Sequence, residues 1–402
     1  MYISIKDKEA SFEYDQKTAP VRADPRAEMA ARLPKAVQPF LTWLTAKPAP
    51  GEPITRRSPY SYVAAAVILT IGGCVMSFLA MLNFPDFSLL SSILLPTGLV
   101  LTTSGLGLFQ VVIFHHCAHN TVFRTQETNL LAGRMISALL LFKYFDAYKH
   151  EHLLHHSPKI QFTDQDEFSD FMVNMCGFPA GQSRRKLWLH LIGMLVSPSF
   201  HAKFLYRRIR GSLGSENWRH NALGITFWCA LLIASAAYHW LMLVSITWVL
   251  PVSVLLQIAT VFRILCEHRV PEPEILAAGG RTLVSQATSG VMPGAAVPSR
   301  DLPAYRSVAA WSLWWLNMLT VQLFVRVFVL VGDAPCHDFH HRRPGHGWTS
   351  YIQGRQSDMD AGSPGFPSNY LETWGLFRAV DANFALLAQA SPSALRRPSK
   401  RI

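Results

Sequence analysis

Residues 146–166, DAYKHEHLLHHSPKIQFTDQD, place His150, His152, His155 and His156 within seven positions of the chain. If this stretch is helical, His152 lies one turn before His155 and His156, so these three imidazoles share one face of the helix. A helix that presents several ring nitrogens on one face can offer them to a single metal ion. The stretch therefore predicts a metal site.

The same HxxHH spacing returns at His337, His340 and His341, and a related HxxxH spacing occurs at His115 and His119. A lone buried histidine is most often a packing residue, but three separate clusters need a common cause. Together they offer eight imidazole ligands, whereas one zinc ion takes three or four. The number of ligands predicts two metal ions, although imidazole by itself suits zinc, iron, copper and nickel.

The composition indicates a membrane protein. Half of the 402 residues are hydrophobic, only 16% are charged, and the apolar residues come in long runs. The net charge of +11 comes from Lys and Arg residues that lie between these runs, rather than in one stripe with interleaved aromatics. We therefore expect no nucleic-acid partner. The six Cys residues include no CxxC pair, which argues against a disulfide framework or a zinc ribbon.

Two apolar hairpins are expected to cross the membrane. Residues 62–82 and 89–114 are each long enough to span it, and residues 222–266 form a second hairpin broken near Tyr238. The turn after the first span holds no Lys or Arg, whereas the preceding residues are rich in them. The positive-inside rule then places the N-terminus and the histidine clusters on the cytoplasmic side of a cell inner membrane or its equivalent.

Two further apolar segments are expected to lie in the interface. Residues 130–142 are too short to span and carry Arg134. Residues 311–331 are long enough, but a span there would put His337 and its neighbours across the membrane from the other clusters. If all the histidines serve one site, this segment must lie along the interface or re-enter, and Arg326 within it favours that interpretation.

The predicted fold is therefore an all-α integral membrane protein, with about four transmembrane helices in two hairpins, interfacial helices and a cytoplasmic histidine-rich cap. Residues 1–60 are interpreted as a cytoplasmic N-terminal tail and residues 61–350 as the membrane domain. Residues 351–402 are interpreted as a cytoplasmic C-terminal segment that ends in a disordered basic tail. The Gly-, Pro- and Ser-rich residues 269–308 are expected to form a loop.

The three histidine clusters resemble those of the membrane di-iron superfamily of fatty acyl desaturases, alkane and fatty acid hydroxylases, and carotenoid ketolases. HHCAH at 115–119, HLLHH at 152–156 and HDFHH at 337–341 are similar to its three histidine boxes, and the resemblance covers residues 60–350. CEHRV at 266–270 looks like an additional EH element of alkane monooxygenases and some desaturases. The resemblance implies a metal-ligand set of nine histidines: His115, His119, His152, His155, His156, His268, His337, His340 and His341.

The resemblance implies that the chain is an O₂-dependent oxidoreductase with two non-haem iron ions. Its substrate would be a lipid or carrier-bound acyl chain with unactivated C–H bonds. The reducing electrons would come from an external donor of the ferredoxin, rubredoxin or cytochrome b5 type. A fatty acyl desaturase is the first hypothesis, and an alkane or fatty acid hydroxylase is the second. A membrane zinc hydrolase or receptor is an alternative from another class, but it leaves most of the histidine clusters unused. A metal transporter is a third, but its spans would carry polar or ionisable residues, and the long spans here contain few of them.

Each metal-bound imidazole needs a partner that orients its second nitrogen. Acidic residues close to the boxes in sequence are the candidates for this role: Asp146, Glu151, Asp166, Glu267 and Asp338. His116 and His150 fall off the ligand faces and are interpreted as packing or surface residues. His346 follows the third box in a Gly-rich loop. The remaining histidines have no partner at ligand spacing and are expected to be structural: His190, His201, His220 and His239.

Overall fold

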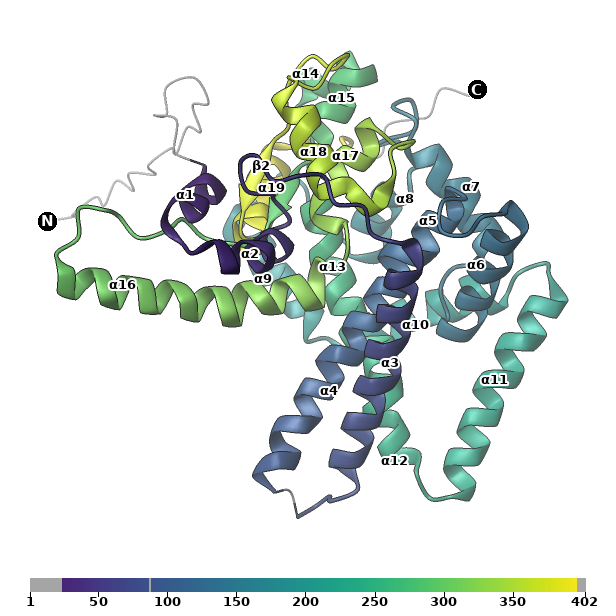
Figure 1. Cartoon of the computed structure of the whole chain (residues 1–402). Coiled ribbons are helices and arrows are strands. Elements are labelled where there is room, and N and C mark those ends of the chain that lie inside the picture. The colour runs from purple at the N-terminus through teal and green to yellow at the C-terminus, as the bar shows by residue number, and fades with distance from the viewer. Residues whose placement is uncertain (1–23, 87, 396–402) are drawn as a thin grey trace, which may run out of the picture.

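The computed structural model of this chain describes residues 24–86 and 88–395, and these are mostly helical. Two long helical hairpins extend from one side of a broad cap of shorter helices (Figure 1). The two strands, β1 (Gly290–Met292) and β2 (Glu372–Trp374), form one short parallel pair inside the cap. The predicted all-α architecture is confirmed, while the predicted basic tail falls mainly in residues 396–402, outside the described residues.

The first hairpin consists of α3 (Pro59–Met81) and α4 (Leu89–Gly107). Ser58 and Ser88 cap the two helices by accepting hydrogen bonds from backbone N–H groups of the first turns. The helices approach closely because small residues face each other: a Cβ on Gly98 would lie 2.6 Å from the Gly73 carbonyl oxygen. Helices embedded in lipid associate through close packing of this kind, because the hydrophobic effect does not drive them together there.

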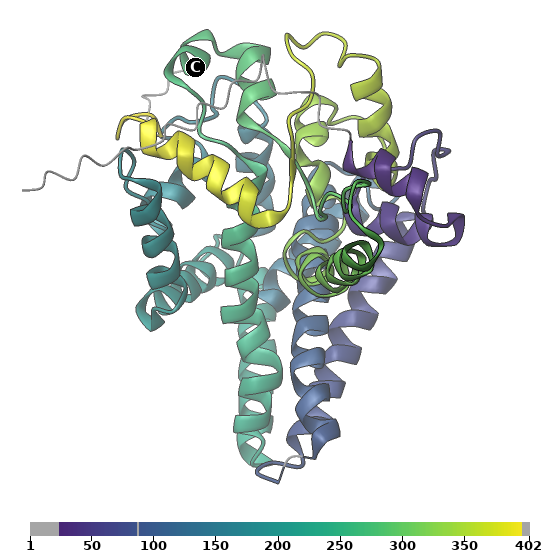
Figure 2. The same cartoon turned by 90° about the vertical axis from the view of Figure 1, so that its left-hand side faces the viewer.

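The second hairpin joins α11 (Trp218–Ala237) to a continuous helix, Leu241–Glu267, that contains α12 (Leu241–Val244) and α13 (Leu256–Glu267). π-Helical turns lie between α12 and α13, one of them at Pro251, whose ring removes an N–H from the helical ladder. Both hairpins turn at the end far from the cap (Figures 1 and 2). All four predicted spans are therefore helices of sufficient length and hydropathy to cross a membrane.

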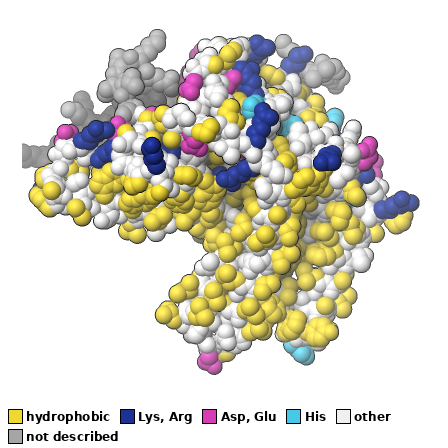
Figure 3. Space-filling view, in the orientation of Figure 1, with side chains coloured by type: hydrophobic (Ala, Val, Ile, Leu, Met, Phe, Trp, Pro, Cys, Tyr) yellow, Lys and Arg dark blue, Asp and Glu magenta, His cyan; other side chains and the backbone are white. Residues whose placement is uncertain are grey.

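A fifth apolar helix, Ala304–Val329, begins with α16 (Ala304–Asn317) and is also long enough to span. It lies across the ends of the hairpins instead of alongside them (Figures 1 and 2). Its exposed apolar side chains include Tyr305, Val308 and Leu313, and hydrophobic side chains cover the face of this helix on the hairpin side of the cap (Figure 3). This is the orientation expected of a helix in the membrane interface.

Arg326 is a charged residue within this apolar helix, and its contacts explain how the charge is accommodated. Its guanidinium is buried, donates hydrogen bonds to the carbonyl oxygens of Trp43 at 2.8 Å and Gly332 at 2.7 Å, and lies over the Trp43 ring. The charge is thus stabilised by carbonyl oxygens and an aromatic face within the chain. The same contacts hold the end of this helix against the N-terminal segment, just before the third histidine cluster.

The cap is built from short helices of every part of the chain. Residues 269–308, expected to be a loop, contain two helices and β1, because their apolar side chains pack into the core beside α13. The described part of residues 351–402 is also folded, and β2 pairs with β1. The cap elements are α1 (Pro25–Arg32), α2 (Gln38–Thr45), α5 (His115–Ala118), α6 (Gln126–Leu140), α7 (Phe145–His155), α8 (Glu167–Asp170), α9 (Arg184–Leu195), α10 (Pro198–Leu213), α14 (Pro273–Ala278), α15 (Gly280–Ala287), α17 (His337–Arg342), α18 (Tyr351–Asp360) and α19 (Leu376–Gln389).

The contact between α3 and α4 gives a direct test of the first hairpin. We expect Gly98→Leu to lower the unfolding temperature of the purified protein in detergent, because its side chain would meet the backbone of α3, and overpacking costs about 1–3 kcal/mol. Gly72→Leu is the matched control, since nothing lies within 4 Å of a Cβ there. Equal unfolding temperatures for the two variants would contradict the packing described.

Candidate metal centre

The first histidine cluster stands at the cap end of the first hairpin. After α4 the helix continues through a π-helical turn, Leu108–Phe114, and then through α5, so His115 and His119 extend from the end of a membrane-length helix. π-Helical turns alter the direction of the side chains that follow them and are frequent at functional sites. His115 is buried and His119 is partly buried.

The second cluster lies on α7, which is helical as the spacing predicts. Gly133 of α6 lets α7 approach closely, because a Cβ there would lie 2.3 Å from the Phe145 ring. Arg134 of α6 binds Asp146 in the first turn of α7, with Nη2 donating to Oδ2 at 2.6 Å. These contacts fix α7 so that its histidines face those of α5.

The third cluster lies on α17, a short helix whose box is anchored by a buried ion pair. Arg355 of α18 donates to both carboxylate oxygens of Asp338, from Nε and Nη2, each at 2.8 Å. Both side chains are almost fully buried. This bidentate pairing fixes the rotation of α17, with His337, His340 and His341 turned toward the other clusters.

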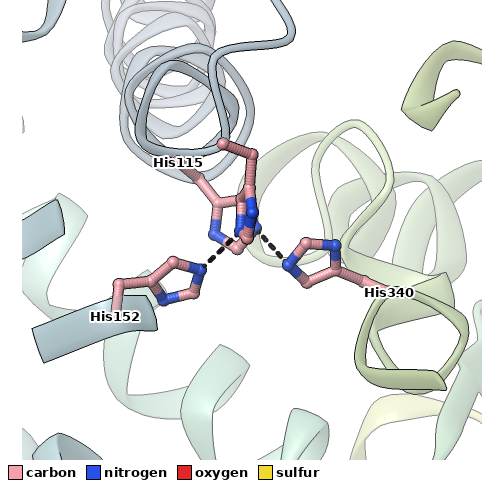
Figure 4. Close-up of side chains that lie close together, drawn as sticks. His115, His152 and His340 are labelled. Atoms are coloured by element: carbon pink, nitrogen blue, oxygen red, sulfur yellow. Dashed lines mark hydrogen bonds between the residues drawn. The ribbon is translucent and has the colours of Figure 1, made fainter. Parts of the chain in front are cut away.

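All nine predicted ligand histidines meet in the cap, and their contacts share one feature: they are made between Nε2 atoms. Six such pairs lie within hydrogen-bonding distance: His115–His340 at 2.8 Å, His119–His152 at 3.0 Å, His152–His156 at 3.1 Å, His155–His268 at 3.2 Å, His268–His337 at 3.1 Å and His337–His341 at 3.1 Å. Figure 4 shows the rings of His115, His152 and His340 pointing toward a common centre from three different elements.

These ring nitrogens form two compact groups. Ligand atoms of His115, His119, His152 and His340 all lie within 4.8 Å of one another, and so do those of His155, His268 and His341. We call these the first group and the second group. His156 contacts the first through His152, and His337 contacts the second through His268 and His341.

The spacing of these nitrogens fits metal coordination. Two imidazole nitrogens bound to one metal at about 2.0–2.1 Å, and at about a right angle, lie roughly 3 Å from each other. The observed separations of 2.8–3.2 Å match that value. Each group therefore has the donor atoms and the spacing to hold one ion.

Comparison with known families agrees with this geometry. The fatty acid desaturase family matches residues 90–353, about two-thirds of the chain, including all three histidine clusters and His268. The chain belongs to the fatty acid desaturase family. Membership makes it a membrane oxidoreductase of the desaturase and hydroxylase type. Neither the comparison with curated proteins nor that with solved structures gave a match.

In this desaturase-family chain, two carboxylates lie beside imidazoles of the predicted ligand set. Asp166 lies 2.6 Å from His155 Nδ1, and Glu167 lies 3.5 Å from His152 Nδ1. A carboxylate at Nδ1 favours the tautomer with its proton there, which leaves the lone pair on Nε2. Sequence reasoning nominated Asp166 but missed Glu167, although Glu167 is the next residue in the same TDQDE run.

Three neutral side chains occupy similar positions and were also missed. The Tyr351 hydroxyl lies 2.8 Å from His340 Nδ1, the Gln161 amide 3.3 Å from His341 Nδ1, and the Tyr148 hydroxyl 3.5 Å from His115 Nδ1. Sequence reasoning considered only acids for this role. A search for any hydrogen-bonding side chain near the boxes would have included Gln161 in the second-box stretch.

The other four nominated acids pair with cations instead of an imidazole. Each lies near a histidine in sequence, but its carboxylate forms an ion pair with an Arg or Lys. The pairs are Asp146 with Arg134, Glu151 with Lys143, Glu267 with Arg263 and Asp338 with Arg355. For these four, the expected contact with a ligand histidine is therefore not made.

The remaining histidines have other contacts. His116 is buried, pairs with Asp333 at 2.9 Å and stacks on Trp348, while His150 is exposed. His346 lies beside Ser350, outside both groups. Of the four histidines expected to be structural, His190 and His220 each bind a backbone carbonyl. His201 binds both a carbonyl and Gln257, and His239 lies at the far turn of the second hairpin.

Burial keeps most of these imidazoles neutral. Burial and the neighbouring rings lower the pKa of His119 to about 3 and hold the pKa values of His340 and His341 well below normal. His155 differs: burial lowers its pKa, but Asp166 outweighs this effect, and the pKa is raised. Neutral imidazoles have free lone pairs, which is the state that metal binding requires.

Asp166 and Glu151 allow a matched test of carboxylate orientation. We expect Asp166→Asn to weaken metal binding by about 10–100-fold, since the amide removes the charge that stabilises the Nδ1–H tautomer of His155. Glu151→Gln is the control, because Glu151 of α7 binds Lys143 near the surface and no imidazole. Metal retained by each purified variant during chelator titration measures the effect. Equal retention would show that Asp166 has no such role.

Proposed function

We propose that this chain is an O₂-dependent, non-haem di-iron oxidoreductase that acts on unactivated C–H bonds of lipid acyl chains, and that it is a fatty acyl desaturase. The observation that carries the proposal is the convergence of seven imidazoles in two groups, with His156 and His337 in contact with them and Nε2 separations of 2.8–3.2 Å. Family membership supports the reaction class. We assign the nine histidines as the metal ligands.

The donor set favours iron over zinc. Structural zinc sites close with four ligands, and catalytic zinc keeps three protein ligands and one open position. Here two groups contain seven histidines, and His156 and His337 contact them, so nine imidazoles are available, which is more than two such zinc sites need. Carboxylate-bridged di-iron bundles use Glu-x-x-His pairs on their helices, whereas the converging ligand atoms here are all imidazole nitrogens.

The chain's own residues hold and orient this ligand set. When bound, two iron ions would supply the activation of O₂ and the removal of hydrogen from a chain carbon. Asp166 and Glu167 fix the tautomers of His155 and His152, and Tyr351 fixes the ring of His340. Burial of both groups excludes bulk water from the ligand nitrogens.

The position of the site supports a lipid substrate. His115 and His268 follow directly from the two membrane-length helices that end in the cap, so the site lies where the hairpins leave the apolar layer. An acyl chain held in the membrane, or presented by a carrier at its surface, can reach this position. The substrate is therefore proposed to be a lipid or a carrier-bound acyl group.

The distribution of charge supports a cytoplasmic cap. Neither far turn, at residues 82–88 or 238–240, contains Lys or Arg, whereas these residues are common on the cap (Figure 3). By the positive-inside rule the cap and the N-terminus face the cytoplasm of an inner membrane or its equivalent. There the site would receive electrons from a soluble or membrane-bound donor of the ferredoxin, rubredoxin or cytochrome b5 type.

A hydroxylase of alkanes or fatty acids is the second candidate. One observation favours it: His268 of the CEHRV element belongs to the second group, with its Nε2 3.2 Å from that of His155. This element resembles one that alkane monooxygenases and some desaturases carry.

Metal content tests the ligand assignment. We expect the purified protein to hold about two irons per chain, and His155→Ala to lose iron because the second group is left with too few nitrogens. His150→Ala is the matched control from the same helix, since His150 is exposed and lies outside both groups. Zinc in place of iron in the active protein, or unchanged iron in His155→Ala, would contradict the assignment.

Product analysis tests the reaction. Mass spectrometry would compare acyl lipids and an added alkane from cells expressing the intact protein, His155→Ala or His150→Ala. We expect a product that has lost two hydrogens with the intact protein and His150→Ala, and none with His155→Ala. A product that has gained one oxygen would establish the hydroxylase instead. An iron-loaded protein that forms neither product from these substrates would contradict both.

A further inference from the structure

His268 is held differently from His155 and His340, whose second ring nitrogens contact a carboxylate and a hydroxyl group. It is the first residue after α13, has an extended backbone, and is buried. Its Nδ1 has no hydrogen-bond partner among the described residues. The direction of this ring is therefore set by the backbone that carries it, because no side chain fixes its second nitrogen as Asp166 does for His155.

Asn383 of α19 fixes that backbone. Its amide nitrogen donates to the carbonyl oxygens of Leu265 at 3.0 Å and His268 at 2.9 Å. Its side-chain oxygen accepts from the N–H of Val270 at 3.0 Å. One buried amide thus satisfies three backbone groups on both sides of His268, where the helical ladder of α13 has ended.

Two other contacts hold this backbone: an isolated antiparallel bridge between His268 and Thr288, and the Ser289 hydroxyl, which donates to the Cys266 carbonyl at 3.4 Å. The next contact comes from Arg269, whose N–H donates to the Ala287 carbonyl at 2.8 Å. Helix α19, drawn in yellow, crosses near the cap end of α13 in Figure 2, and the two helices pack together in the main core cluster. Asn383 is 1% exposed in this contact, so water cannot replace its hydrogen bonds.

Asn383 lies outside the part of the chain that matches the family, which ends at residue 353. The same is true of Arg355, which binds Asp338 beside His337 and also donates to Glu372 at 2.6 Å. Residues 354–395 therefore contact the metal-binding elements at two separate points: the third box and the His268 turn. Only one histidine of the first group, His340, belongs to an element that these contacts reach, which is the third box.

We propose that Asn383 is a positioning residue for His268, and that the segment 354–395 thereby holds the second group in its metal-binding arrangement. The inference rests on the proposed di-iron function. Loss of the Asn383 amide frees two carbonyl groups and one N–H around His268, so the imidazole no longer points at His155 and His341. The first group, built from His115, His119, His152 and His340, keeps its ligands.

Asn383→Asp is the sharpest test, because it preserves size and replaces the N–H donors with a second carboxylate oxygen. The carboxylate still accepts from Val270, but it has nothing to donate to the Leu265 and His268 carbonyls and repels both. Arg378→Ala on the exposed side of the same helix is the control. Full-length proteins would be purified in detergent, loaded with ⁵⁷Fe, and measured for iron content and Mössbauer spectrum.

We expect the intact protein and Arg378→Ala to hold about two irons per chain, and Asn383→Asp to hold about one, with the spectral component of one site lost. Asn383→Ala should give the same pattern. Two irons with an unchanged spectrum in Asn383→Asp would overturn the inference, and so would equal loss from both sites. An intact protein that binds no iron would instead refute the proposed function, and this inference with it.

Discussion

The structure depends on holding nine imidazoles close together, with their Nε2 atoms face to face. Nitrogen lone pairs 2.8–3.2 Å apart repel unless a proton or a cation lies between them. Protonation is costly here, since burial and the neighbouring rings hold the pKa values of most of these histidines well below normal. A cation bound at the proposed centre would relieve this repulsion. Without one, the surrounding contacts have to hold the rings in place.

That requirement explains the architecture around the site. Each histidine-bearing element is fixed by a contact that has no part in metal binding itself: Arg134 holds α7 through Asp146, and Arg355 holds α17 through Asp338. Arg326 anchors the chain before α17 to the N-terminal segment. These ion pairs and carbonyl contacts are directional, and apolar packing alone would leave the rotation of such short helices undetermined.

The membrane imposes the second constraint. Two hairpins deliver His115 and His268 to the cap from the ends of apolar helices, while the fifth apolar helix lies across them and returns the chain to the same side. Figure 3 shows the result: hydrophobic side chains cover the hairpins and one face of that helix, and Lys and Arg gather on the cap. The site is thereby held between an apolar layer and a charged surface.

The sequence by itself determined the helical hairpins, the cap and the clustering of histidines, because apolar length and the 3.6-residue period are local properties. It could show that His152, His155 and His156 share a helix face. Only the tertiary structure decided which residues orient the imidazoles. Asp146, Glu151 and Asp338 are near in sequence but face cations, whereas Tyr351 and Asn383 come from segments that folding brings to the site. Contacts of this kind depend on the packing of distant elements, which no local spacing records.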